Sequence, residues 1–140
     1  MKTIFVIGDR EDAVAIGNAA EPMEDWQGIE VNGVDAAKMA MLHSLLTGDT
    51  FQDASSHYHS MYSASDYGPW IFPIPEIVLE RLAELEDEME TVAEELAATE
   101  EFEAEGWSLE QVEIIVSDLT TLAKACLAEE KELFMWMGEM

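Results

Sequence analysis

The sequence predicts an α+β domain, in which three or four helices pack on a small sheet of two or three strands that includes the N- and C-terminal strands. Two observations lead to this prediction. β-branched and aromatic segments stand near both ends of the chain, and between them apolar residues recur at steps of three and four. The 140 residues contain no internal repeat and no linker-like stretch, which fits a single domain over residues 1–140.

Two strands are predicted in the first part of the chain. Residues 3–7 are β-branched or aromatic and end at Gly8-Asp9, which is typical of a short buried strand. Residues 28–31 resemble them and end at Asn32-Gly33, a turn signal. Between the two strands, residues 12–20 favour a helix that an internal glycine weakens.

A helix is predicted from Asp35 to Gly48, because Asp35 suits an N-cap and glycine commonly follows a helix end. Its apolar positions have helical spacing: Met39, Leu42, Leu45 and Leu46. Residues 50–67 are serine-rich and favour a helix that frays before Gly68-Pro69. Residues 70–75 are apolar with two prolines, which favours an edge strand or an extended connector because proline cannot donate to a strand ladder.

The longest predicted helix covers residues 75–103. Its apolar stripe consists of Val78, Leu82, Leu85, Met89, Val92, Leu96 and Ala97. An unbroken helix would be about 43 Å long, so a break near Glu86-Asp87 is compatible with the pattern. Ser108 and Gln111 match a capping box that begins the last helix, which continues to about Ala128. Residues 133–137 form a closing strand that we expect to pair with the N-terminal strand.

The charge balance excludes several classes of protein. Thirty-one Asp and Glu stand against six Lys and Arg, for a formal net charge of −25. Direct binding to nucleic acid or to an anionic membrane surface needs clustered basic residues, and these are scattered singly. No apolar run reaches the roughly 18 residues of a membrane-spanning helix. With 49% hydrophobic residues, the chain is also too apolar for a disordered acidic tail.

Cys126 is the only cysteine, so no disulfide is expected within the chain. The first residues do not resemble a secretory signal peptide, and we expect the protein in a reducing cytoplasm. Cys126 has the spacing of a buried helix residue rather than the setting of a nucleophile. No catalytic motif occurs, so the sequence favours a protein that is not an enzyme.

The acidic residues concentrate in the longest predicted helix. Residues 76–105 contain 13 acids and a single base, Arg81. Like charges four residues apart cost a helix about 0.2–0.5 kcal/mol each at low salt, and a surface selected only for solubility would include Lys. The acidity of this face therefore either serves binding or is an adaptation to the salt content of the organism's surroundings.

The leading hypothesis is a non-enzymatic inhibitor of the immunity or antitoxin type, which occludes a basic toxin or nuclease through its acidic helix. The predicted contacts are Glu84, Asp87, Glu88, Glu94 and Glu95, with Tyr58 and Tyr62 as aromatic contacts. A DNA mimic that blocks a DNA-binding protein is a further alternative. A homodimer is compatible with the apolar stripe if two chains share it.

The other alternative is a small cytosolic enzyme or ligand-binding domain with a pocket near His43 and Trp70. A buried, fully packed His43 would count against it. Asp53, His57 and His59 resemble a metal-ligand set, but on a helix positions 57 and 59 point about 200° apart. We therefore expect no metal and no cofactor.

Several motifs together resemble a family of small uncharacterised bacterial proteins with no established activity. They are Lys38-x-x-x-Leu42-His43-x-x-Leu46-Thr47-Gly48, then Gly68-Pro69-Trp70-x-Phe72 before Pro75, then Ala98-Thr99-Glu100-Glu101-Phe102 with Trp107, and Leu133-Phe134-Met135-Trp136-Met137. The match covers the chain from about Gly33 onward. This resemblance implies a bacterial cytosolic origin and a single-domain outline, and it assigns no catalytic role.

Overall fold

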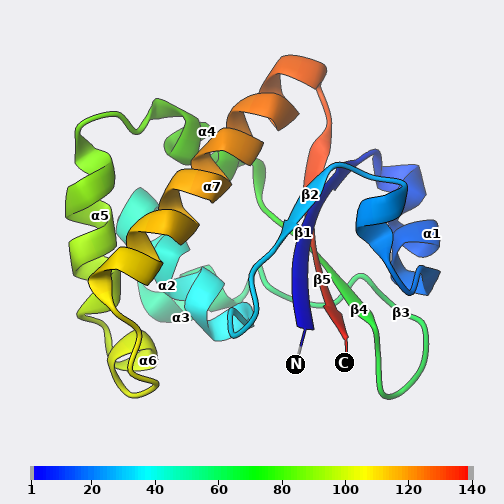
Figure 1. Cartoon of the computed structure of the whole chain (residues 1–140), viewed down its shortest axis with the longest axis horizontal. Coiled ribbons are helices and arrows are strands. Elements are labelled where there is room, and N and C mark those ends of the chain that lie inside the picture. The colour runs from blue at the N-terminus through cyan, green and yellow to red at the C-terminus, as the bar shows by residue number, and fades with distance from the viewer. Residues whose placement is uncertain (1, 139–140) are drawn as a thin grey trace.

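The computed structural model describes residues 2–138, and its centre is an antiparallel sheet of five strands in the order β2-β1-β5-β4-β3. The strands are β1 (Lys2–Gly8), β2 (Gly28–Glu30), β3 (Tyr62–Ser63), β4 (Trp70–Pro73) and β5 (Glu132–Gly138). The two ends of the described chain lie side by side, because β1 and β5 are neighbours in the sheet (Figure 1).

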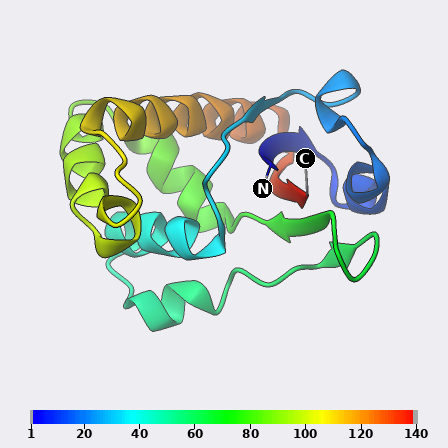
Figure 2. The same ribbon diagram turned by 60° about the horizontal axis from the view of Figure 1, so that its bottom comes forward.

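Seven helices occur within residues 2–138. They are α1 (Ala13–Asn18), α2 (Ala36–Thr47), α3 (Phe51–Ser55), α4 (Glu76–Glu84), α5 (Glu88–Ala97), α6 (Glu100–Glu103) and α7 (Leu109–Glu129), with short 3-10 turns at Arg10–Asp12 and Pro22–Glu24. The larger helices gather on one side of the sheet and α1 covers the other side (Figures 1 and 2).

The predicted fold class is therefore wrong in its counts, since it allowed three or four helices and two or three strands. One long predicted helix is three helices. Leu85 leaves helical geometry with φ −67° and ψ 131°, and Thr99 starts α6 from an extended conformation. The chain turns at Leu85 while keeping that side chain in the core, so the apolar spacing continues across the break.

The segment 50–67 was predicted as a fraying helix, yet only Phe51–Ser55 is helical and Tyr62–Ser63 adds a strand. β4 is not the edge strand that its prolines suggested, because it pairs with both β5 and β3. The two-residue β3 lies opposite Trp70 and Ile71 only. Pro73 extends beyond this partner, so its missing N–H interrupts no bond to β3.

The central strands are buried on both faces, and their side chains divide between two cores. Phe5, Ile7 and Met135 face the larger helices, in the main core. On the opposite face, Ile4, Val6, Phe134 and Trp136 contact Ala13 and Ile16 of α1. The apolar stripe of α4 and α5 packs in the main core of the same chain, so the structure does not leave it free for a second copy.

One buried charge joins α2 to the loop that follows α6. The Lys38 side chain is 2% exposed and its ammonium bonds to Glu105, while a carboxylate oxygen of Asp35 lies 3.8 Å from that ammonium. The same ammonium lies 5.8 Å from the centre of the Phe102 ring. A buried cation that loses its partner is destabilising because its desolvation is no longer offset.

We expect Glu105→Gln to lower the free energy of unfolding by about 1–2 kcal/mol, because a charged hydrogen bond to a buried cation becomes a neutral one while Asp35 remains nearby. Urea denaturation monitored by circular dichroism measures the change. Glu103→Gln is the matched control, since Glu103 is exposed on α6. Equal stabilities of the two variants would contradict this role for Glu105.

Candidate functional site

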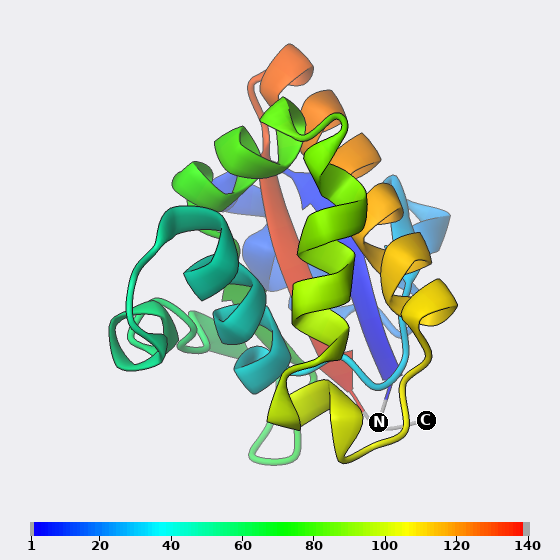
Figure 3. The same cartoon turned by 90° about the vertical axis from the view of Figure 1, so that its left-hand side faces the viewer.

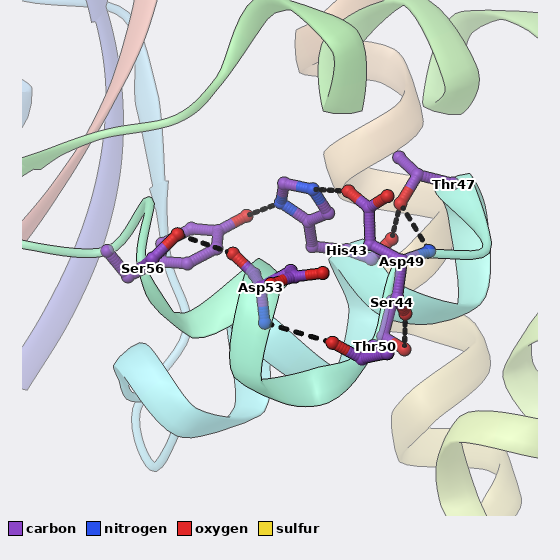
Figure 4. A network of polar contacts seen from close by, with 8 residues as sticks. His43, Ser44, Thr47, Asp49, Thr50, Asp53 and Ser56 are labelled. Atoms are coloured by element: carbon purple, nitrogen blue, oxygen red, sulfur yellow. Dashed lines mark hydrogen bonds and ion pairs between the residues drawn. The ribbon is translucent and has the colours of Figure 1, made fainter.

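Three polar side chains that lie apart in the sequence meet where α2 ends and α3 begins. His43 lies in the last turns of α2, and Asp49 follows the helix end at Gly48 (Figure 4). His57 follows α3. Gly48 has a φ of 84°, a conformation that glycine adopts without strain. This residue reverses the chain, and Asp49 consequently lies against the turn that carries His43.

The His43 ring has no exposed surface, and both of its nitrogens have partners. Nδ1 lies 3.2 Å from the hydroxyl of Tyr58, and Nε2 lies 3.3 Å from a carboxylate oxygen of Asp49. The exposed His57 ring stacks on it with 5.0 Å between ring centres. If Tyr58 donates to Nδ1 and Nε2–H donates to Asp49, a neutral His43 has all of its hydrogen bonds.

The loop that carries Asp49 is held by short-range hydrogen bonds. The Ser44 hydroxyl donates to the Asp49 carbonyl at 2.6 Å, and the Asp49 N–H donates to the Thr47 hydroxyl oxygen at 3.2 Å. Thr50 caps α3 by accepting from the Asp53 N–H at 3.1 Å. Figure 4 shows these bonds around the imidazole. The backbone on both sides of the Asp49 carboxylate is thus fixed.

Burial is the largest effect on the ionisation of this cluster. It lowers the pKa of His43, and the nearby His57 lowers it further, while the hydrogen bond to Asp49 acts in the opposite direction. Burial also raises the pKa of Tyr58, so its hydroxyl keeps its proton. At neutral pH the cluster therefore contains a neutral His43 and a protonated Tyr58.

The ligand atoms of His43, Asp49 and His57 lie within 4.8 Å of one another. The three residues that the sequence suggested as a ligand set, Asp53, His57 and His59, do not meet in this group; only His57 belongs to it. Sequence inspection missed Asp49, although glycine at a helix end is a signal that the next residue folds back on the last turn.

A substrate pocket at His43 is disfavoured by the lack of any exposed surface on its ring. Two cavities lie elsewhere in the molecule, away from His43. One, of about 450 Å³, lies between the start of α4 and the end of α7, where Leu79, Cys126 and Lys131 line it. A second of the same volume is lined by Tyr67, Pro69 and Trp136.

Cys126 lines the first of these cavities but has the properties of a core residue. Its side chain has no exposed surface, and burial, with a smaller contribution from Glu129, raises the pKa of the thiol to about 11. Thiolate is the reactive form of cysteine. A nucleophilic role near neutral pH is therefore disfavoured.

The second candidate region is the acidic surface formed by the five predicted partner contacts on α4, on α5 and between them. All five are exposed: Glu84, Asp87, Glu88, Glu94 and Glu95. Residues seven apart on a helix share a side, which groups Glu88 with Glu95. Figure 3 shows α5 on the outside of the molecule, in front of the sheet.

Little positive charge compensates this acidic surface. Arg81 lies 3.4 Å from Glu84, and it is the one base between Lys38 and Lys124 in the sequence. The Glu86 N–H donates to the Glu88 carboxylate at 3.3 Å, and backbone donors at the start of α5 lower the pKa of Glu88. Glu88 therefore stays ionised when the solution is made mildly acidic.

A groove lined by aliphatic and charged side chains opens beside these acids, where α2, α4 and α5 meet. It has a volume of about 260 Å³. Its lining residues are Leu45, Leu46, Arg81, Glu84, Leu85, Glu88 and Val92. The groove thus combines aliphatic side chains with two carboxylates that the sequence had selected as partner contacts.

The two tyrosines selected from the sequence do not extend this surface. Tyr58 is 6% exposed and bonds to His43, so it is not an exposed aromatic contact. Tyr62 is half-buried on β3, and its hydroxyl donates to Asn18 at 2.9 Å. Both tyrosines follow α3 in a serine-rich segment, whose sequence does not show which side chains turn toward the core.

Comparison with protein-family models and with curated proteins gives no match. Among solved structures, the fold resembles the crystal structure of YfbM from Escherichia coli, a protein of unknown function, with a TM-score of 0.53 and 14% sequence identity. The alignment covers 97% of this chain and 99% of that one. At this identity the likeness shows the fold alone, and it agrees with the resemblance to small bacterial proteins without established activity. Among the described residues, no helix combines the length and the apolar character needed to cross a membrane.

We expect Tyr58→Phe to reduce the free energy of unfolding by about 1–3 kcal/mol, because the buried Nδ1 of His43 loses its partner. Chemical denaturation measures this change. Tyr62→Phe is the control, since its hydrogen bond is exposed and should contribute less. A loss from Tyr62→Phe as large as that from Tyr58→Phe would contradict the importance of the His43 bond.

Cys126 should react slowly with iodoacetamide in the folded protein. With its pKa raised from 9.0 to about 11, the thiolate fraction at pH 8 falls about 100-fold relative to the unfolded chain. The folded-state rate should rise with pH until about pH 11. Mass spectrometry of the alkylated protein with and without urea measures both rates, and equal rates would contradict a buried thiol.

Proposed function

We propose that this chain is a non-enzymatic acidic binding protein of the immunity or antitoxin type, which docks its α4–α5 surface on a basic toxin or nuclease. The observation that carries the proposal is the groove in which aliphatic side chains lie beside Glu84 and Glu88. Acidic residues alone would support only electrostatic attraction. A groove of this composition adds a specific place for a side chain of the partner.

An arginine or lysine of the partner fits the chemistry of this groove. Its methylene stem would pack on Leu45, Leu85 and Val92, and its charged end would meet Glu88 and Glu84. Arg81 also lines the groove and lies 3.4 Å from Glu84, so Glu88 is the carboxylate without a competing cation from α4. Arginine suits the site best because its planar guanidinium pairs with carboxylates through two hydrogen bonds. Arginine is also among the residues that contribute most to binding energy at protein interfaces.

The remaining acids would act over a longer range. Asp87 at the start of α5 and Glu94 and Glu95 within it are exposed, and none of them takes part in an ion pair among the described residues. Such a field raises the association rate with a positively charged partner and disfavours acidic partners.

The single buried cysteine supports a reducing cytoplasm as the compartment in which this binding occurs.

The test is capture of the partner from a lysate of the source organism at about 0.1 M and about 1 M salt, where screening differs strongly. We expect one stoichiometric basic protein at low salt and less of it at high salt. A variant with Gln or Asn in place of Glu84, Asp87, Glu88, Glu94 and Glu95 should lose it. Mass spectrometry identifies the captured protein, and growth assays on co-expression show whether the chain neutralises it.

A matched control changes the same number of charges elsewhere. We suggest neutralising five exposed acids outside α4 and α5, namely Glu11, Glu24, Asp25, Asp66 and Glu129. This control should retain most of the captured protein. Equal losses in both variants would show that net charge alone is responsible, and absence of a basic partner at either salt would overturn the proposal. Capture of a DNA-binding protein whose DNA competes for it would identify a DNA mimic instead.

A further inference from the structure

We propose that His43, Asp49 and His57 bind a divalent transition-metal cation of the zinc class. This site is separate from the groove on α4 and α5 and does not depend on the function proposed above. The three residues come from the end of α2, the turn after Gly48 and the segment after α3, and their donor atoms lie within 4.8 Å of one another. Convergence of these three donors is the observation that carries the proposal.

The donor set selects the kind of metal. Two imidazole nitrogens and one carboxylate oxygen suit Zn²⁺ and neighbouring transition metals, whereas Mg²⁺ and Ca²⁺ prefer oxygen ligands throughout. Three protein ligands leave one position of a tetrahedral metal for water or for an external ligand. The site is thus of the open type.

The distances are close to those that a metal requires. With bonds of about 2.1 Å, two ligands at a tetrahedral angle lie about 3.4 Å apart. His43 Nε2 and Asp49 Oδ2 are already 3.3 Å apart. The donor atoms of the group lie within 4.8 Å of one another, so the His57 donor has to approach by up to about 1.5 Å to reach this spacing. The His57 ring also has to turn out of its stack on His43, because an imidazole nitrogen binds a metal in the plane of its ring. Its exposed side chain leaves room for this rotation.

The surroundings orient His43 for this role. Tyr58 contacts Nδ1, so Nε2 is the nitrogen that faces the exposed residue Asp49. On metal binding, the His43 proton would move from Nε2 to Nδ1 and bond to the Tyr58 oxygen. A partner on the second ring nitrogen is usual for histidine ligands of metals. The bonds from Ser44 and Thr47 hold the Asp49 backbone in place.

Isothermal titration of the whole chain with ZnCl₂, after treatment with a chelator, tests the site. We expect one tight equivalent of Zn²⁺ per chain. His57→Gln and Asp49→Asn should each weaken binding at least about tenfold. Both residues are exposed, so these variants are expected to fold, and circular dichroism checks that they do. His43 is left intact because its substitution would disturb the core.

The chain offers two matched controls close by. His59→Gln removes the other exposed histidine of this segment, and Asp53→Asn removes an exposed acid of α3. Both should keep the wild-type affinity, and millimolar Mg²⁺ should not displace the bound Zn²⁺. Several weak equivalents that survive His57→Gln would mean that only the acidic surface binds metal and would overturn the proposal. Equal loss in His59→Gln and His57→Gln would overturn it as well.

Discussion

The antiparallel pairing of β1 with β5 is the interaction on which the rest of this structure depends. It runs over seven residue pairs, from Lys2 opposite Gly138 to Gly8 opposite Glu132. Alternate side chains of both strands point to opposite faces, and nearly all are buried. A strand pair that is apolar on both faces must be covered on both. The helices α4 and α7, together with their neighbours, form one cover, and α1 with Trp26 forms the other. This requirement explains why the chain adds small elements around a short sheet.

The charge distribution follows from the same requirement. Once the apolar stripe of α4 and α5 is committed to the main core, their acids have only the outer side to occupy. Mutual repulsion along these helices is not relieved by neighbouring lysines, and Arg81 contacts one carboxylate alone. Lys38 does not compensate these surface acids, because its side chain is buried beside Glu105 and Asp35. The protein therefore uses one of its few cations internally and leaves most of its outer acids without a basic partner.

Local patterns in the sequence were sufficient for some elements and insufficient for others. The helix limits at Asp35 and Gly48 follow from residues whose own chemistry favours those positions, and the structure shows the cap and the left-handed turn there. The break at Leu85 has no such marker. Apolar spacing reports which side of the chain is buried and does not report the direction of the chain, so it continued through the turn. The cluster of His43, Asp49 and His57 depends on how α2 and α3 meet, and its members have no common spacing. For the same reason Tyr58 was taken as exposed although it seals this cluster from the inside.

The pairing of the chain ends has a further consequence, for the time before folding is complete. β1 can pair with β2 early, because a short connection joins them. The other edge of β1 stays unpaired until β5, from the far end of the sequence, has folded against it. During that interval an apolar strand presents free backbone donors and acceptors, which can recruit the same strand of another molecule into an aggregate. Chains that each carry a formal charge of −25 repel one another at such close approach. The acid excess would therefore keep incompletely folded molecules apart, whatever it does for the finished one.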